Sequence, residues 1–475
     1  MAARRTRIVA TLGPATDRPG VLREVIAAGA DVVRLNASHG TRADHLRRLT
    51  AVREIARELG RNVGVLLDLQ GPKIRVGELP VAGVVLREGE RFTLTNRRDA
   101  SGASLVTVDY EPLPREVAPG NRLFLDDGNI ALCVERTDGK DIECAVERGG
   151  VLTSHKGINA PGAALSAAAL TEKDREDAAF GVTNEVDFIA LSFVRRAADV
   201  LALRQVAGGA AIVAKIERPE ALSEIDGILE AADAIMVARG DLGVEIPLEE
   251  VPMVQRTLLH AANRAAKPAI TATQMLESMV THPRPTRAEA TDVHVAVTQL
   301  TDAVMLSAET AVGRYPADAV RAMAKIALAA ETDPALLGAP RAKIDVARDA
   351  TEAVAQAACE VAAELGACAI VCSTSSGFTP RVVAKYRPDV PIVALAHDAR
   401  VRRRLSLTWG VDPVASPPIR STDEMLAAAT RTVIDAGVAK LGDVVVITAG
   451  VPVGTPGHTN LIKVHRLGDP ITSGI

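Results

Sequence analysis

Four short apolar runs in the middle of the chain decide the fold: DFIALSF (187–193), AIVAKIE (211–217), DAIMVARG (233–240) and PAITATQ (268–274). Between them lie longer stretches with helical spacing of apolar residues, such as EEVPMVQRTLLHAANRAAK (249–267). Strands that are apolar along most of their length and alternate with helices form parallel sheets buried on both faces. The middle of the chain is therefore predicted to be an α/β structure with a parallel sheet.

Four further runs of the same kind lie on either side of this region: RIVATL (7–12), DVVRLN (31–36), VGVLLDL (63–69) and DAVMLS (302–307). Eight such strands are the number that closes into a (β/α)8, or TIM, barrel. The alternative is an open doubly wound sheet, but its usual GxGxxG or GxxxxGK[ST] phosphate loops are absent. Thr171-Glu-Lys-Asp174 and Thr286-Arg-Ala-Glu289 fit the capping-box pattern that begins a helix. We predict a catalytic barrel formed by residues 1–71 and 169–340.

Two further domains interrupt and follow the barrel. Residues 72–168 switch to the alternating pattern of β-strands, with Asp138-Gly139 as a hairpin turn. This pattern predicts a small inserted β-barrel in a loop on the carboxyl face of the main barrel, where it would act as a lid over the active site. Residues 341–475 again alternate helical and strand patterns, which predicts a separate α/β domain.

The composition limits the kinds of partner. The 475 residues carry a net charge of −4, and 48% are hydrophobic but only 2% aromatic. This balance excludes disorder as the main state and argues against binding to nucleic acids or anionic membranes. No apolar run reaches the roughly 18 residues of a membrane span, and the five cysteines fit no zinc-type spacing. We expect a cytoplasmic protein that meets anionic ligands with local clusters of cations.

Polar residues follow almost every predicted strand, at the barrel end where catalytic groups gather. Lys215 and Glu217 are two residues apart in one strand, so both side chains face the barrel mouth. Glu217 and Asp241 suit a hard cation such as Mg²⁺, whereas Arg34, Arg75 and Lys215 suit a small, multiply charged anion. Any one of these residues alone would more simply be a structural ion pair or a cap. Six such strand ends on one face favour a functional site.

Long motifs in this region closely resemble those of the pyruvate kinase family. They are RLNASHG (34–40), LDLQGPKIR (67–75), KIERPE (215–220), IMVARGDLGVEIP (235–247), ITATQMLESM (270–279), PRPTRAEATDV (283–293) and DAVMLSAETAVGRYP (302–316). The resemblance runs from Arg7 to about Leu467, keeps the order of the motifs and includes the insert and the C-terminal domain. We take it as specific to that family rather than to barrels in general.

The resemblance implies transfer of the phosphoryl group of phosphoenolpyruvate to ADP, giving pyruvate and ATP. The implied cofactor is Mg²⁺, with Mn²⁺ as the alternative. It implies that Lys215 neutralises the transferring phosphoryl group and the developing enolate. The other matching positions are Arg34, Gly240, Asp241 and Thr273 for the substrate; Glu217 and Asp241 for the metal; Asn36, Ser38, His39, Arg75 and Lys156 for the nucleotide, with Arg75 also on phosphate; and Thr273, Ser307 and Glu309 for proton transfer. Members are typically homotetramers. For His39, capping of the next helix is the simpler alternative.

One departure from the family pattern concerns potassium. Potassium-dependent members carry Glu and Thr where this chain has Lys73 and Leu69, and they hold K⁺ with residues that match Asn36, Ser38 and Asp68. A lysine ammonium supplies a fixed positive charge where the potassium would contribute one. We therefore expect no K⁺ requirement and a residual cation pocket.

The C-terminal domain contains CSTSSGFTPR (372–381), a strand followed by a turn rich in hydroxyl groups that opens a helix. Such a turn can bind phosphate, and in the family this position resembles the loop that holds a phosphorylated effector. The residues are Ser373, Thr374, Ser375, Ser376, Gly377 and Thr379. An ordinary capped helix is the alternative.

Other assignments compete with a kinase. A Mg²⁺-dependent barrel lyase such as an aldolase would explain Glu217 and Asp241 but not the insert or the C-terminal domain, and a non-catalytic effector-binding relative would not need Lys215. Elsewhere, Arg4, Arg5 and Arg7 are predicted to form a solvated terminus, and Asp126-Asp127 a turn, with a nucleotide-side role for Asp127 as the minor alternative.

Overall fold

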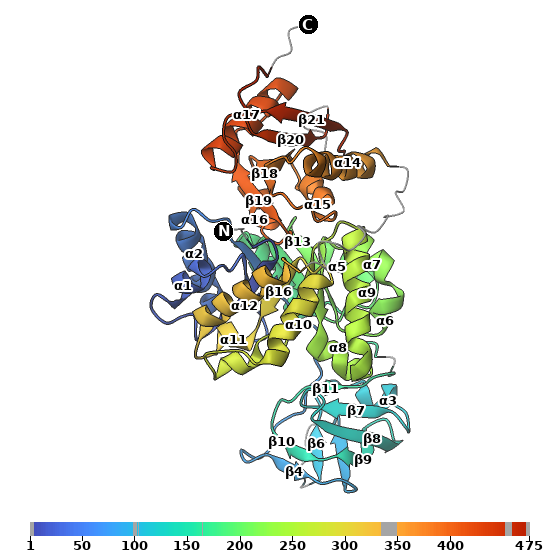
Figure 1. Cartoon of the computed structure of the whole chain (residues 1–475). Coiled ribbons are helices and arrows are strands. Elements are labelled where there is room, and N and C mark those ends of the chain that lie inside the picture. The colour runs from blue at the N-terminus through green and yellow to red at the C-terminus, as the bar shows by residue number, and fades with distance from the viewer. Residues whose placement is uncertain are drawn as a thin grey trace.

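Eight parallel strands close into a barrel at the centre of the molecule (Figure 1), as predicted. The computed structural model describes residues 4–97, 102, 104–163, 165–333, 349–451 and 458–471. The strands, in chain order, are β1 (Arg7–Thr11), β2 (Val32–Asn36), β3 (Gly64–Asp68), β12 (Phe188–Leu191), β13 (Ala211–Ile216), β14 (Ala234–Ala238), β15 (Ala269–Ala272) and β16 (Ala303–Leu306). The last strand pairs with the first, Arg7 opposite Ala303, and this pairing closes the ring.

Helices surround the barrel. They are α1 (Val21–Ala27), α2 (Arg42–Glu58), α4 (Glu172–Thr183), α5 (Ala197–Arg204), α6 (Glu220–Ser223), α7 (Ile225–Ala231), α8 (Arg239–Glu245), α9 (Val251–Arg264), α10 (Arg287–Thr298), α11 (Ala308–Ala311) and α12 (Pro316–Ala330), with 3-10 turns η1 (Leu248–Glu250) and η2 (Glu277–Val280). Two short ones, α8 and α11, follow β14 and β16 at the carboxyl end of the barrel. Both predicted capping boxes form, at the start of α4 and of α10, and a third begins α2 at Thr41. These caps satisfy the first free amides of each helix.

The barrel strands are buried on both faces, which explains why they are apolar throughout. One apolar cluster fills the interior and includes Val9, Leu66 and Met236. A second joins strand residues such as Val33 and Ile212 to the surrounding helices. Because packing uses the strand interiors, the strand ends are the places where polar side chains can gather.

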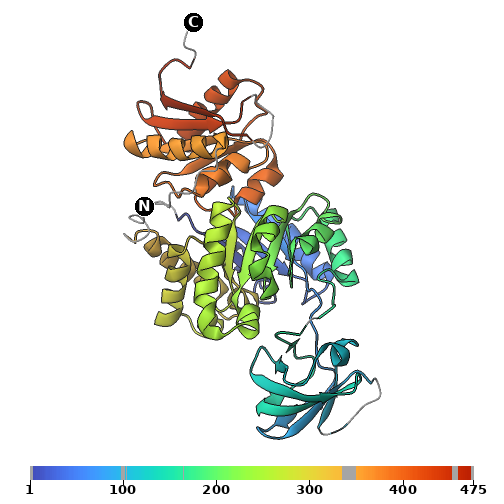
Figure 2. The ribbon, with the colours of Figure 1, turned by 90° about the vertical axis from the view of Figure 1, so that its right-hand side faces the viewer.

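The described part of residues 72–168, called the insert below, forms a β-rich unit at one end of the barrel (Figure 2). Its elements are β4 (Val84–Leu86), β5 (Arg91–Thr95), β6 (Leu105–Thr107), α3 (Leu113–Glu116), β7 (Arg122–Leu125), β8 (Ile130–Thr137), β9 (Asp141–Arg148), β10 (Gly150–Leu152) and β11 (Ile158–Asn159). They make a six-stranded sheet and a two-stranded one around a separate apolar core. The turn at Asp138-Gly139 joins β8 and β9, with Gly139 at φ 84°.

The C-terminal α/β unit lies at the opposite end of the barrel from the insert (Figures 1 and 2). Its sheet has the order β19-β18-β17-β20-β21, and only β21 runs antiparallel to its neighbour. The elements are α14 (Ala350–Glu364), β17 (Ala369–Ser373), α15 (Phe378–Ala384), β18 (Ile392–Ala396), α16 (Ala399–Leu405), β19 (Val411–Ala415), α17 (Thr422–Asp435), β20 (Val444–Ala449) and β21 (Leu461–Arg466).

Arg5 and Arg7 join the barrel to this C-terminal unit, and Arg4 pairs with Asp31 of the barrel, so the prediction of a solvated terminus was wrong. Arg7 is buried; its guanidinium donates to the carbonyls of Thr408 and Val411. Arg5 lies 5.4 Å from the centre of the Trp409 ring, and Arg387 lies 4.7 Å from it. The charge of the N-terminal arginines suggested solvent exposure. At the junction, however, the guanidinium group of Arg7 donates hydrogen bonds to backbone carbonyls and that of Arg5 lies over an aromatic ring.

Candidate active site

Lys215 lies at the centre of a charged cluster at the carboxyl ends of the barrel strands. Its Nζ is 2.7 Å from Glu217 Oε1, 2.8 Å from Ser192 Oγ and 3.4 Å from Asp68 Oδ1. Burial alone would lower the pKa of this lysine, but the nearby carboxylates, Asp68 before Glu217 and Asp241, outweigh it and raise the pKa. Lys215 therefore stays charged, with only 11% of its side chain exposed.

Arg34 brings a second cation to the same cluster. Its Nε is 2.7 Å from Asp68 Oδ2, and its Nη1 donates to Thr11 Oγ1 at 3.2 Å. Burial would raise the pKa of Asp68, but Lys215 and then Arg34 hold it below its ordinary value. The Asp68 carboxylate thus fixes two cations side by side, and this concentration of positive charge suits the end of the barrel to an anion.

Two acidic residues lie beside the lysine, as the strand spacing predicts. Glu217 is buried, and its Oε2 accepts a hydrogen bond from the Phe193 amide at 2.8 Å. Asp241 is half-buried in the first turn of α8 and accepts no hydrogen bond from the part of the chain that the structure describes. Burial and the charge of Asp241 raise the pKa of Glu217 despite the nearby lysine.

This pair fits a divalent cation. A positive ion between two carboxylates would relieve their repulsion, and Mg²⁺ usually takes one or two protein carboxylates and fills its other positions with water and substrate oxygens. Within the described residues no group of three or more His, Cys, Asp or Glu side chains could hold a metal. Two carboxylates leave most positions around such an ion to water and substrate oxygens.

Gly240 and Thr273 meet next to the acidic pair. The Gly240 amide donates to Thr273 Oγ1 at 2.8 Å, and Thr273 has a left-handed backbone, with φ 69°. Arg239 holds this conformation, because its Nη2 donates to the Thr273 carbonyl at 2.7 Å and its Nη1 pairs with Asp292 at 2.6 Å. A non-glycine residue at such an angle is uncommon and marks a site under constraint. The sequence pattern assigned no role to Arg239.

Ser307 and Glu309 follow β16 at the same end of the barrel. Glu309 is fully buried; its Oε2 accepts from the Ser307 amide at 2.6 Å and its Oε1 from the Leu276 amide at 3.0 Å. Burial raises the pKa of Glu309 in spite of these hydrogen bonds. Its position joins the loops after β15 and β16, while Ser307 is half-buried.

The residues expected on the nucleotide side divide between the barrel and the insert. Asn36 Oδ1 accepts from the Ser38 amide at 3.1 Å. Burial and then the charges of Arg75, Arg34 and Lys73 lower the pKa of His39, which places these cations near its ring. Arg75 donates to the His155 carbonyl at 2.9 Å.

Lys156 points within the insert rather than to the barrel. Its Nζ is 2.5 Å from Asp126 Oδ1, and this hydrogen bond lowers the pKa of Asp126. Asp126 and Asp127 both have φ 52°, consistent with the predicted turn. The charge of Arg75 therefore acts on His39, whereas Lys156 pairs with Asp126 inside the insert.

Lys73 also lies toward the insert. Its Nζ is 3.8 Å from Asp127 Oδ1, and a Cβ added at Gly157 would lie 2.8 Å from its Cε. Leu69 is buried, with 1% of its surface exposed. Leu69 belongs to the apolar cluster that joins the strands to the surrounding helices, and the Asp68 carboxylate of the expected cation pocket is already paired with Arg34 and Lys215.

The predicted effector turn lies in the C-terminal unit, between β17 and α15. The Gly377 amide donates to Thr374 Oγ1 at 2.8 Å, and Gly377 has φ 82°. Thr379 is buried and its hydroxyl lies 2.9 Å from that of Thr459. Thr374 therefore already caps the turn, and Thr379 faces the core. Ser375 and Ser376 are exposed.

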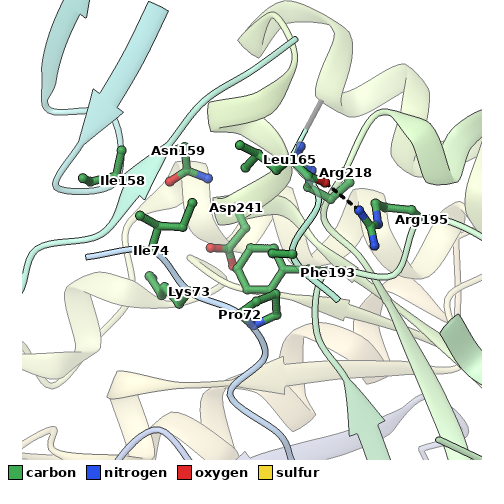
Figure 3. A pocket seen from close by; sticks show the side chains of 11 residues that line it. Pro72, Lys73, Ile74, Ile158, Asn159, Leu165, Phe193, Arg195, Arg218 and Asp241 are labelled. Atoms are coloured by element: carbon green, nitrogen blue, oxygen red, sulfur yellow. Dashed lines mark hydrogen bonds between the residues drawn. The ribbon is translucent and has the colours of Figure 1, made fainter. Parts of the chain in front are cut away.

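Figure 3 shows a pocket between the insert and the barrel that the sequence did not reveal. Pro72, Lys73 and Ile74 line it from one connection of the insert, and Ile158, Asn159, Leu165 and Ala167 from the other. The barrel contributes Phe193, Arg195, Arg218 and Asp241. Because these residues come from distant segments, no local pattern identifies the pocket.

A closed barrel whose mouth holds buried cations between carboxylates defines an enzyme of the TIM-barrel class with a site for an anion. Comparison with known proteins narrows this class. Residues 3–320 match the family model "Pyruvate kinase, barrel domain", and residues 352–465 match "Pyruvate kinase, alpha/beta domain". The chain therefore belongs to the pyruvate kinase family and is a phosphotransferase, and the resemblance inferred from its motifs is confirmed.

Similar proteins cover nearly the whole chain. A pyruvate kinase of Geobacillus stearothermophilus is 46% identical, over 99% of this chain and 82% of its own length. One from Mycobacterium tuberculosis (strain CDC 1551 / Oshkosh) is 44% identical, over 98% and 99% respectively. One from Clostridium acetobutylicum is 40% identical, over 97% and 99%. Among the described residues, no helix is both long and apolar enough to span a membrane.

Proposed function

We propose that this enzyme catalyses Mg²⁺-dependent phosphoryl transfer from phosphoenolpyruvate to ADP, giving pyruvate and ATP, as the last step of glycolysis in the cytoplasm. The observation that carries the proposal is the charged Lys215, held between Asp68 and Glu217 with Arg34 alongside. Phosphoryl transfer depends on positioned cations more than on covalent chemistry with the protein. This cluster supplies such cations at a buried, fixed place.

Each residue has a role in the proposed reaction. A β-phosphate oxygen of ADP bonds to the phosphorus of phosphoenolpyruvate while the bond from that phosphorus to the enol oxygen breaks. Lys215 and Arg34 balance charge on the phosphoryl group, and Lys215 also stabilises the enolate. Glu217 and Asp241 would hold Mg²⁺ (or Mn²⁺), which supplies further stabilisation of the same oxygens. The Gly240 amide and Thr273 orient the substrate carboxylate.

The last step is protonation of the enolate carbon to give pyruvate. Thr273 supplies the hydroxyl nearest the carboxylate clamp, and Ser307 belongs to the same strand ends. Glu309 acts through Ser307, because it holds the Ser307 amide rather than facing the cluster. On the nucleotide side, we assign Asn36, Ser38, His39, Arg75 and Lys156 to ADP. Lys156 must leave Asp126 to do so, which fits an insert that moves as a lid.

The test is an assay with phosphoenolpyruvate and ADP in which pyruvate is coupled to lactate dehydrogenase. We expect turnover that needs both substrates and stops when EDTA removes the metal. Release of pyruvate without ADP would indicate a lyase, and binding without turnover would indicate a non-catalytic relative. Either result would overturn the proposal.

We further propose that the enzyme needs no K⁺. With tetramethylammonium as the only bulk monovalent cation, activity should equal that with K⁺. Lys73→Glu replaces a cation with an anion near the site, and activity without K⁺ should fall about tenfold and recover when K⁺ is added. Strong activation of the unmodified enzyme by K⁺ would contradict this proposal.

We propose that a small molecule with a single phosphate group regulates the enzyme by binding the turn between β17 and α15. The exposed hydroxyls of Ser375 and Ser376 are the groups free to bind it. Ribose 5-phosphate is a suitable probe: it should lower the phosphoenolpyruvate concentration at half-saturation, and Ser376→Asp should abolish this effect by repelling the phosphate. An unchanged response to ribose 5-phosphate in Ser376→Asp would exclude the turn as the effector site.

We also propose that the enzyme is a homotetramer. Light scattering of the purified enzyme tests this oligomeric state.

A further inference from the structure

Helix α8 connects the candidate active site to the insert. It is seven residues long, and its first turn supplies Gly240 and Asp241. Its last two residues, Val244 and Glu245, face the insert. Residues four apart lie on the same side of a helix, so Asp241 and Glu245 are aligned. A helix rises about 1.5 Å per residue, so only a short length of α8 separates Asp241 from Glu245.

Two parts of the insert contact the end of α8. The turn after β7 lies against Val244, since a Cβ added at Gly128 would be 3.5 Å from Val244 Cγ2. Asn159, in β11, donates from Nδ2 to Glu245 Oε1 at 2.9 Å. In Figure 3 Asn159 comes from the insert and lies across the pocket from Arg218, close to Asp241. The insert therefore packs against the last two residues of α8.

Glu245 depends strongly on these partners. Its side chain is 1% exposed, and Arg218 Nη1 lies 3.0 Å from the same oxygen that accepts from Asn159. Its other oxygen, Oε2, is buried and has no hydrogen-bond partner among the described residues. A buried carboxylate with one unsatisfied oxygen is costly, and each remaining hydrogen bond matters more as a result.

Asn159 follows any movement of the insert. It pairs with Phe124 of β7 in the sheet of the insert. Its neighbour Ile158 donates from its amide to the Ile74 carbonyl, and Val76 donates to the Lys156 carbonyl. The two connections of the insert are thus hydrogen-bonded to each other, so the insert cannot rotate without displacing Asn159.

We propose that Glu245 is a positioning residue that ties the orientation of the insert to the place of Gly240 and Asp241. This inference rests on the proposed function, because it gives those two residues a role in the reaction. When the insert is in place, Asn159 holds Glu245, and Glu245 fixes the helix whose other end carries the carboxylate clamp and one metal ligand. Glu245 itself does not contact the substrate.

A reciprocal exchange tests the proposal. Asn159→Asp places two carboxylates face to face. Glu245→Gln removes the charge that pairs with Arg218 but keeps an amide oxygen that accepts from Asn159, and the double variant restores the hydrogen bond with its direction reversed. Asn159→Asp should lower kcat about tenfold, because small displacements of positioned groups are costly to rate, with the KM for phosphoenolpyruvate within about twofold, and Glu245→Gln should lower kcat less. The double variant should regain most of the lost kcat.

Controls separate this role from a general loss of structure. Glu249→Gln changes an exposed glutamate in η1, just after α8, and should leave kcat unchanged. Asn159→Ala changes only the insert and should lower kcat even if Glu245→Gln does not fold. A normal kcat in Asn159→Asp and Asn159→Ala, or a double variant whose losses simply multiply, would overturn the positioning role. An unmodified enzyme without activity in the same assay would instead contradict the proposed function.

Discussion

The two ends of the barrel bury the same kinds of charged side chain but leave them in different states. At the amino ends, an aspartate directly precedes each of β2, β12, β14 and β16. Each accepts a backbone amide of the neighbouring strand and pairs with at least one arginine: Asp31 with Arg4, Arg7 and Arg61; Asp187 with Arg53 and Arg403; Asp233 with Arg204; and Asp302 with Arg387. Each of these carboxylates is thus held by at least one amide and one arginine, and three of the four are buried, whereas 41% of the Asp233 side chain is exposed.

At the carboxyl ends the partners are incomplete. Asp241 accepts no hydrogen bond from the described residues, and Lys215 shares two carboxylates that also serve Arg34 and the Phe193 amide. Thr273 keeps a left-handed backbone. Burial of charge is common to both ends, so burial alone does not identify a site. The unused capacity of the groups distinguishes a binding site from a structural ion pair.

The largest effect should follow a change at the carboxyl end. Lys215→Met removes the central cation, and kcat should fall about a thousandfold or more, because charge that develops in the reaction loses its stabilisation. The coupled assay measures this, and circular dichroism should show an intact fold. Lys325→Met, at an exposed position of α12, is the control and should leave kcat unchanged. If Lys215→Met kept more than a tenth of the original kcat, the charged cluster at the carboxyl ends would be no more catalytic than the ion pairs at the amino ends.

A change at the amino end should act on stability instead. Asp31→Asn keeps the shape of the side chain but leaves three arginines without their carboxylate, which should cost about 3 kcal/mol. Urea unfolding followed by circular dichroism measures the loss, and the kcat of the folded variant should stay within about twofold of normal. A normal midpoint with a much reduced kcat would assign Asp31 to the reaction.

The same aspartate sets a pH dependence. Burial would raise the pKa of Asp31, but the arginines outweigh it and hold the pKa below its ordinary value. Its contribution to stability is therefore complete above the ordinary carboxyl pKa of about 3.9 and is lost as the pH falls through the lower folded value. The difference in stability between the original protein and Asp31→Asn should be constant near neutral pH and shrink below about pH 4. A difference that grows on acidification would contradict this.

The smallest effect should come from a single methyl group in the carboxylate clamp. A Cβ at Gly240 would lie 3.4 Å from Thr273 Oγ1, an ordinary contact distance, so Gly240→Ala should fold normally. Its methyl group would lie beside the proposed clamp and should lower kcat/KM for phosphoenolpyruvate about tenfold by displacing the substrate carboxylate. Gly243→Ala is a matched control on the same helix, since its Cβ would lie 3.6 Å from the nearest atom. It should leave catalysis unchanged. Equal losses in both variants would show that α8 tolerates no substitution, rather than that the clamp is tight.

Local patterns predicted most of the barrel. Runs of apolar residues set the eight strands, and the alternation of Lys215 and Glu217 placed both at the barrel mouth, because these features depend on spacing within one segment. The amino-end ion pairs were missed, and Arg7 was assigned to solvent. A signal was present: four of the eight strand runs begin with aspartate.

The remaining site residues could not be predicted, because they depend on contacts between distant segments. Asn159 and Glu245 are 86 positions apart and meet only through the placement of the insert. Likewise, nothing near Arg239 in the sequence indicates that it holds the Thr273 carbonyl. In such cases chemistry follows from tertiary packing, and only the resemblance to a family pointed to some of the positions.

The junction between the barrel and the C-terminal unit offers an optical signal. The chain contains one tryptophan, and that residue, Trp409, lies beside the guanidinium groups of Arg5 and Arg387 at this seam. Ultraviolet emission selected for indole therefore comes from a single place, far from the reacting atoms. Any ligand that shifts the two units against each other will change the intensity or wavelength of that emission, without an attached dye.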